Sequence, residues 1–207
     1  MLSLLYHFTK LVLLLTLPFI LLVRGSLLVM EQNGLPAYPS LAVGAGMTIL
    51  VLFIYFSFFY GRLAGKFGSF DTVKRRALMA FLIVGIYLFH GIFLFSAANA
   101  KTSMVSEEFK ELHPILRLGI STLIHFDKQL IITDAERVAG DYQSMGLSEN
   151  KNSKHYRQRD GYVHAVDLRT KNRGELRNKF LSFYFKTMGF NTLRHGGTAD
   201  HLHVALY

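Results

Sequence analysis

The sequence contains no cysteine, and its first half contains almost no acidic residues. The lack of cysteine excludes a disulfide framework, which a domain of this size does not require, so the absence leaves the cellular compartment open. Among residues 1–100 the only acids are Glu31 and Asp71, against seven lysines and arginines. Residues 101–207 hold twelve acids, sixteen bases and seven of the nine histidines. The sequence therefore predicts a membrane region in residues 1–100 and a compact soluble domain in residues 101–207.

Three apolar stretches in the first half predict transmembrane α-helices. The clearest is "LAVGAGMTILVLFIYFSFFY", which runs for twenty residues without a charge. Twenty helical residues cross a hydrocarbon core of about 30 Å. The first stretch contains His7 and Lys10 and is also compatible with a signal peptide, but no small-residue cleavage site follows it. We therefore expect three spans, at about 4–23, 41–60 and 77–97.

Basic residues gather in the loop between the second and third expected spans. This loop, "GRLAGKFGSFDTVKRR", carries five lysines and arginines against Asp71, whereas the loop after the first span is neutral. The positive-inside rule places the basic loop in the cytoplasm. Residues 101–207 are then expected on the extracytoplasmic side of the membrane. The net charge of +9 follows from this topology, and we expect no nucleic-acid partner.

The second half predicts an α+β domain with a small, mainly antiparallel sheet, preceded by the three transmembrane helices. Within 174–190, Leu176, Phe180, Phe183 and Met188 or Phe185 recur at helical spacing, which predicts an amphipathic helix. The other expected elements are helical segments at 104–130, with a break at His113-Pro114, and at 134–146; a surface loop at 148–161; and strands at 162–170, 191–195 and 201–207.

The last ten residues, "TADHLHVALY", place two histidines two positions apart in an apolar run. On a strand His201 and His203 face the same side, as part of a metal or proton-transfer site or as a solvated edge. Upstream, Asp167 lies in mid-strand, where a carboxylate needs a salt bridge, for example to Arg169, or a metal. Two histidines and one aspartate are typical of a catalytic zinc site with an open fourth position.

The segments "NSKH", "HAVDLRT" and "GFNTLRHGGTADHLHVALY" together resemble the LAS-type zinc D-alanyl-D-alanine peptidases, which have the hedgehog/D,D-peptidase fold. That family carries a Ser-x-His-x-x-Gly-x-Ala-x-Asp segment and a later His-x-His. Ser153 and His155 match the start of the first segment, and Ala165 and Asp167 match its end. The resemblance covers roughly residues 130–207.

The chain departs from the family pattern between His155 and Asp167. It has eleven intervening residues where the family has six, and Val163 stands in place of the family's glycine. The extra residues could form a longer hairpin that returns the strand to the same place. Alternatively, they indicate that the metal site is altered or lost in this chain. His164 is the alternative ligand to His155, although regular alternation points it to the opposite face.

The resemblance implies a role for each polar residue of the site. His155, Asp167 and His203 would hold Zn²⁺, which polarises a carbonyl and activates water. His201 would stabilise the developing oxyanion or move a proton, and Asp200 would orient His201 or act as general base.

The family also uses an upstream arginine to bind the substrate's carboxylate or carbonyl groups. Arg137 is the best positional match, and the alternative interpretation of Arg137 is an ordinary exposed helix residue. Arg157 and Arg159 are rivals for the same role. Arg194 and His195 line the same cleft or face solvent.

The function implied by the resemblance is that of a membrane-anchored zinc peptidase, carboxypeptidase-like or endopeptidase-like, which hydrolyses stem peptides or cross-links of bacterial peptidoglycan. Its expected location is the bacterial inner membrane, with the catalytic domain facing the periplasm. The first alternative is a non-catalytic module that binds wall peptides or a partner protein. The second is a membrane protein whose spans carry the function.

Overall fold

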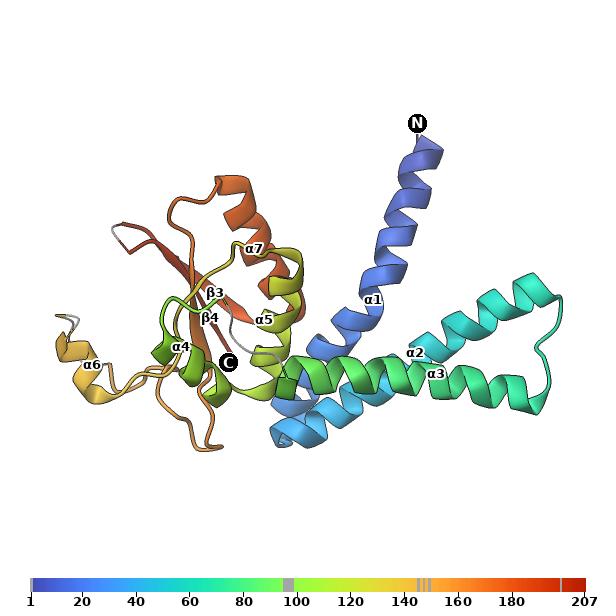
Figure 1. Cartoon of the computed structure of the whole chain (residues 1–207), viewed down its shortest axis with the longest axis horizontal. Helices are drawn as coiled ribbons and strands as arrows, with labels where there is room; N and C mark the ends of the chain where they lie inside the picture. Colours follow the sequence, from blue (N-terminus) through green and yellow to red (C-terminus); the bar gives the residue numbers. More distant parts are fainter. Residues whose placement is uncertain (1, 95–98, 145, 147, 149, 198) are drawn as a thin grey trace. The chain divides into compact units, whose positions relative to one another are not determined.

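The chain forms two compact units, Met1–His90 and Gly91–Tyr207. The first unit consists of long helices and the second of a sheet with helices (Figure 1). The computed structural model describes residues 2–94, 99–144, 146, 148, 150–197 and 199–207.

Three helices of the first unit are long and apolar enough to cross a membrane, which confirms the predicted layout. Helices α1 and α2 extend beyond their expected segments at both ends, and α3 begins seven residues before its expected start. Residues 95–97, the end of the third predicted span, lie outside the described residues. The helices are α1 (Leu2–Asn33), α2 (Ala37–Ala64) and α3 (Phe70–Phe89), the last continued by a π-helical turn η1 (His90–Leu94).

Helices α1 and α2 approach each other closely at Gly44. A Cβ atom at this position would lie 2.1 Å from the Ser26 hydroxyl oxygen and 2.6 Å from the Leu22 carbonyl oxygen. Beside it, the Thr48 hydroxyl donates to the carbonyl oxygen of Pro18 in α1 at 3.2 Å. Small residues that allow backbones to approach, together with hydroxyl hydrogen bonds, are how apolar helices associate where lipid removes the hydrophobic driving force.

We expect Gly44→Leu to separate α1 from α2 and to destabilise the helical unit by about 1–3 kcal/mol, the usual cost of overpacking. Thermal unfolding of the full chain in detergent measures this loss. Gly46→Leu is the matched control, because a Cβ atom there meets nothing within 4 Å. Equal melting temperatures for the two variants would contradict the proposed contact.

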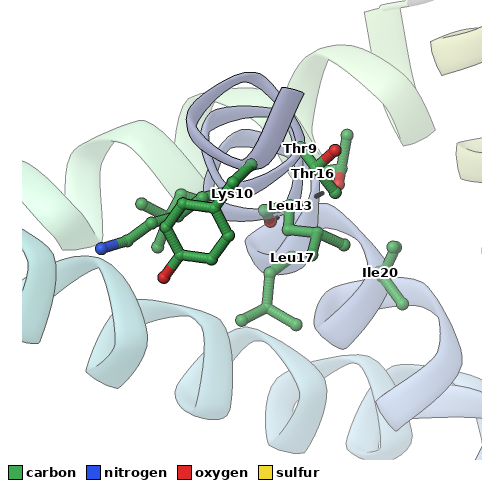
Figure 2. Close-up of a pocket in the computed structure, with 8 residues that line it drawn as sticks. Thr9, Lys10, Leu13, Thr16, Leu17 and Ile20 are labelled. Atoms are coloured by element: carbon green, nitrogen blue, oxygen red, sulfur yellow. Dashed lines mark hydrogen bonds between the residues drawn. The ribbon is translucent and has the colours of Figure 1, made fainter. Parts of the chain in front are cut away.

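A hollow along α1 is lined by residues between Tyr6 and Ile20, most of them apolar. Figure 2 shows Thr9, Leu13 and Leu17 along this hollow. The Thr16 hydroxyl donates to the carbonyl of Val12, a residue of the same helix that the figure does not draw, at 2.9 Å. Because the whole lining belongs to a candidate membrane span, we expect lipid acyl chains to cover it.

The second unit contains a four-stranded antiparallel sheet in the order β1-β2-β4-β3, which agrees with the predicted α+β class. The strand β1 was not predicted; it is three residues long and too short to show alternation. The predicted helix 104–130 is divided into α4, η2 and α5, because Pro114 opens a new helix. The elements are α4 (Ser103–Glu108), η2 (Phe109–Glu111), α5 (Pro114–Phe126), β1 (Ile132–Asp134), α6 (Ala139–Ser144), β2 (Ala165–Arg169), α7 (Glu175–Met188), β3 (Asn191–His195) and β4 (His201–Ala205).

The two faces of the sheet have different roles. Asp167 of β2 pairs directly with His203 of β4, so their side chains share one face. Val204 is the next residue along β4 and lies on the opposite face, together with its cross-strand partner Thr192. The Ser182 hydroxyl of α7 is hydrogen bonded to that of Thr192 at 3.1 Å. Helix α7 therefore covers the face that does not carry Asp167 and His203.

The helix α7 corrects one sequence expectation. Leu176, Phe180 and Phe183, predicted to be its apolar buried face, are 84%, 62% and 64% exposed. Phe185 and Met188, which the prediction offered as the last position of that face, are buried, together with Asn178 and Leu181. Both sets repeat at helical spacing, and the sheet selects the second because the Asn178 amide can donate to the Thr170 carbonyl at the end of β2.

Candidate metal centre

His155, Asp167 and His203 come together on the face of the sheet opposite α7. In the part of the chain that the structure describes, two groups of histidine and acidic side chains bring their ligand atoms close enough to hold a metal ion. One is this group, and the other consists of His113, Asp160 and His164. The two groups differ in which ring nitrogens are available for a metal.

The three ligand atoms of the first group lie at the spacing that a tetrahedral zinc ion needs. The distance from His155 Nε2 to His203 Nδ1 is 3.2 Å, and that from His155 Nε2 to Asp167 Oδ1 is 3.3 Å. His203 Nδ1 lies 2.9 Å from Asp167 Oδ1. Ligands about 2.0–2.1 Å from a tetrahedral ion are separated from one another by about 3.3 Å. The three atoms therefore form one nearly regular triangular face of the coordination tetrahedron.

The orientation of the His155 ring is fixed by a hydrogen bond at Nδ1, the nitrogen that faces away from Asp167 and His203. Its Nδ1–H donates to the Ala135 carbonyl at 2.6 Å, which leaves the lone pair of Nε2 directed at Asp167 and His203. The Ala135 amide donates in turn to the Glu108 carboxylate at 3.3 Å. A backbone carbonyl on the outer nitrogen is the usual support of a histidine that binds a metal, because it selects the tautomer. His155 is only 2% exposed, so this arrangement is shielded from water.

The Asp167 carboxylate is buried and remains ionised. Burial by itself would raise its pKa, but the close contacts of Oδ1 with the His155 and His203 rings, together with the nearby His201, outweigh burial and hold the pKa far below its ordinary value. Its second oxygen, Oδ2, accepts a hydrogen bond from Arg137 Nη2 at 2.8 Å. One carboxylate oxygen thus faces the histidines and the other faces the arginine.

Arg137 bridges two carboxylates that lie side by side. Asp134 is the partner of Asp167 across the β1–β2 pair, and the Arg137 guanidinium contacts both. Burial raises the pKa of Asp134, while Arg137 opposes that effect. Burial would lower the pKa of Arg137, but Asp134 and Asp167 together raise it. Asp167 therefore has the basic partner expected of a mid-strand carboxylate, and the partner is Arg137 rather than Arg169.

The extra residues between His155 and Asp167 form a short hairpin. Arg157 pairs antiparallel with Val163, and the Gln158 amide donates to the Tyr162 carbonyl at 2.8 Å. Gly161, with a φ of 85°, supplies the left-handed turn residue. The chain leaves after His155 and returns to start β2, so the long spacing still leaves His155 and Asp167 in contact. Within the predicted surface loop 148–161, Ser153 and His155 are buried.

His164, the alternative ligand, lies in the second group and not beside Asp167. Its Nε2 is 2.8 Å from Asp160 Oδ2, and Asp160 lies within the hairpin. The third member, His113, accepts a hydrogen bond from the Ile115 amide at Nδ1 and so caps α5. The neutral ring then carries its proton on Nε2, the atom that would have to bind the metal. The Ile115 amide fixes that proton on His113 Nε2, whereas the proton that His203 Nδ1 donates to Asp167 can move to the other ring nitrogen when an ion takes its place, so the first group fits a metal ion better than the second.

Asp200 and His201 are adjacent in sequence but have different surroundings. The Asp200 carboxylate accepts hydrogen bonds from Arg194 at 2.9 and 3.1 Å and from Thr170 at 2.5 Å, which lowers its pKa to about 2. His201 Nδ1–H donates to the Ala199 carbonyl at 2.7 Å, and its Nε2 lies 3.6 Å from Asp167 Oδ2. Thus His201 faces the centre, whereas Asp200 is held at its edge.

His195 also lies beside the centre. It pairs with His201 across β3 and β4, and the two rings stack at 4.8 Å between centroids. Burial and the neighbouring His201 lower the pKa of His195. The other arginines considered from the sequence lie elsewhere: Arg157 binds Glu111 and Glu136, and Arg194 binds Glu175 and Asp200. Among the described residues, no hydrogen bond or ion pair joins Arg159 to His155, Asp167 or His203.

Three supporting groups were not found from the sequence: Asp134, the Ala135 carbonyl and Glu108. Asp134 carries a weak signal, because Arg137 follows it three residues later. The Ala135 carbonyl belongs to the backbone and has no signal in residue types. Glu108 lies 27 positions before Ala135, and only the tertiary fold brings them together.

No protein-family model, no curated protein and no solved structure matches the chain. The resemblance to LAS-type peptidases therefore remains a prediction from short motifs.

Proposed function

We propose that this chain is a membrane-anchored zinc hydrolase that cuts peptide bonds in the stem peptides or cross-links of bacterial peptidoglycan. The observation that carries the proposal is the spacing of the His155, Asp167 and His203 ligand atoms, 2.9–3.3 Å, around one position. Three nitrogen and oxygen ligands with an open fourth position are typical of hydrolytic rather than structural zinc sites.

Zinc held by these residues would polarise the scissile carbonyl and lower the pKa of water at the open position. The Ala135 carbonyl keeps His155 in the ligating tautomer, and Arg137 holds Asp167 so that one oxygen remains for the ion. His201 is 24% exposed and faces Asp167, where it can hold or move a proton or stabilise an oxyanion. In this proposal Arg137 orients Asp167, a ligand of the ion, and this role either accompanies or replaces binding of the substrate's carboxylate.

The apolar helices support the choice of substrate. A soluble unit anchored by three candidate spans, on the side opposite the basic loop, would meet the wall peptides outside the bacterial inner membrane. Peptide amides suit a centre with a buried carboxylate, the Arg137 cation and the partly exposed imidazoles of His201 and His203. The side of the membrane and the wall peptide are parts of this proposal.

The second candidate function is non-catalytic binding of wall peptides on the same fold. The observation that favours it is the state of Asp200, whose oxygens are bound by Thr170 and Arg194 and whose low pKa makes it a weak base. A hydrolase would need another base, for which His201 is the available group, or release of Asp200 from Arg194.

The test uses the full chain purified in detergent. We expect about one zinc per chain by elemental mass spectrometry, hydrolysis of purified muropeptides, and loss of hydrolysis with a chelator that is restored by zinc. His164→Gln is the matched control and should retain both zinc and hydrolysis, because His164 belongs to the other group. Zinc without hydrolysis would favour the binding module, and a chain that takes up no zinc would refute both the hydrolase and its metal centre.

A further inference from the structure

The helix α7 carries a second apolar face that the sheet does not use. Leu176, Phe180 and Phe183 lie at i, i+4 and i+7, so they form one stripe opposite the buried Leu181 and Phe185. Phe126, the last residue of α5, is 86% exposed and lines a shared hollow with Phe180. Four large apolar side chains on one side of a small domain exceed the scattered exposure that is normal for soluble surfaces.

The charges around this stripe are mainly positive. Arg177, Lys179 and Lys186 of α7 and Lys128 after α5 are all exposed. The two acids nearby are already bound within the protein, Asp127 by Arg173 and Glu175 by Arg194. An apolar stripe flanked by lysine and arginine is the pattern of a helix that lies in the interface of a membrane with anionic lipids.

A membrane surface is also within reach of this domain. The last apolar helix ends at Phe93, and Ala100 already pairs with Ile132 of β1. Seven residues of extended chain span about 25 Å at most. The soluble unit therefore stays close to the lipid headgroups whether or not it binds them, which gives α7 a high effective concentration of its partner.

We propose that the exposed face of α7, with Phe126, docks the soluble unit onto the anionic lipid surface of the membrane in which the chain is anchored. The phenylalanines and Leu176 enter the boundary between headgroups and acyl chains, while Lys179, Lys186 and Arg177 contact anionic headgroups.

Docking in this way would orient the candidate metal centre. Helix α7 covers the sheet face of Thr192 and Val204, and the centre lies on the opposite face with Asp167 and His203. With α7 on the bilayer, the centre faces away from it, toward large substrates outside the membrane. The docking proposal does not depend on the hydrolase proposal, since a bilayer would bind α7 with or without zinc.

The absence of tryptophan from the sequence gives a direct test. In the full chain reconstituted into vesicles, Phe180→Trp introduces a single reporter on the stripe, and brominated lipids quench a tryptophan only when it reaches the bilayer. The matched control is Val138→Trp, which is 60% exposed and follows Arg137 on the side of the metal centre. We expect blue-shifted emission and strong quenching for Phe180→Trp, and neither for Val138→Trp.

Charge variants of the reporter protein test the lipid class. In vesicles containing phosphatidylglycerol, Lys179→Gln and Lys186→Gln should each lower the docking equilibrium constant by about fivefold. The control Lys151→Gln, an exposed lysine of the loop before His155, should leave it unchanged. Equal quenching of Phe180→Trp and Val138→Trp would overturn the proposal. It would also be overturned if the Phe180→Trp emission shifts to the blue as the protein concentration rises but is not quenched by brominated lipid, because that result identifies a second copy of the chain as the occupant. If the lysine variants leave the quenching unchanged, the proposal that α7 docks on anionic lipid is refuted.

Discussion

Asp167→Asn is expected to remove zinc from the protein and to abolish hydrolysis of wall peptides. The amide has one neutral oxygen where the carboxylate offers an anionic ligand to the ion and a second oxygen to Arg137. Loss of a direct ligand should weaken zinc binding by more than about 100-fold, the upper end of what removal of a supporting partner costs. Elemental analysis after dialysis against a weak chelator measures the loss.

The matched control is Asp160→Asn, which makes the same change in the second histidine–aspartate group. We expect it to keep zinc and activity. If instead Asp160→Asn releases the metal while Asp167→Asn retains it, the centre has been assigned to the wrong group. If neither variant changes zinc content, the ion is bound outside both groups.

Arg137→Met is expected to destabilise the second unit by about 3 kcal/mol, because it leaves the buried Asp167 and the half-buried Asp134 without their shared cation. For a unit of this size the melting temperature should fall by about 10 °C or more. Thermal unfolding of the metal-free full chain in detergent measures the change. Arg137→Met with Asp134→Asn should recover part of the loss, since one of the two unpaired charges is then absent.

The stability of Arg137→Met should also depend on pH in a defined direction. Burial already raises the pKa of Asp134, and removal of Arg137 raises it further. A carboxyl with a raised pKa binds more protons in the folded state than in the unfolded state, so stability increases as the pH falls. The difference in melting temperature from the wild type should therefore shrink between about pH 7 and about pH 5. A difference that grows over this range would contradict the role given to Arg137.

The sequence predicted the parts of the fold that depend on local pattern. The charge-free run at 41–60 and its two neighbours predicted three long helices, and local residue composition predicted strands at 162–170, 191–195 and 201–207. Alternation also placed His201 and His203 on one face, and the β2–β4 register then put His203 opposite Asp167. The short strand β1 and the orientation of α7 were missed, because three residues show no period and α7 has two apolar stripes.

The same division holds for the candidate site. The residue types and spacing of His155, Asp167 and His203 follow from the sequence by itself, as does the division into an apolar half and a charged half. The tertiary structure decided three further points. A hairpin returns the chain so that His155 contacts Asp167, Arg137 forms ion pairs with both Asp134 and Asp167, and Arg194 forms an ion pair with Asp200. Side-chain period is set by backbone geometry within one element, whereas ion pairing depends on distances between elements far apart in the chain, which only the packed fold determines.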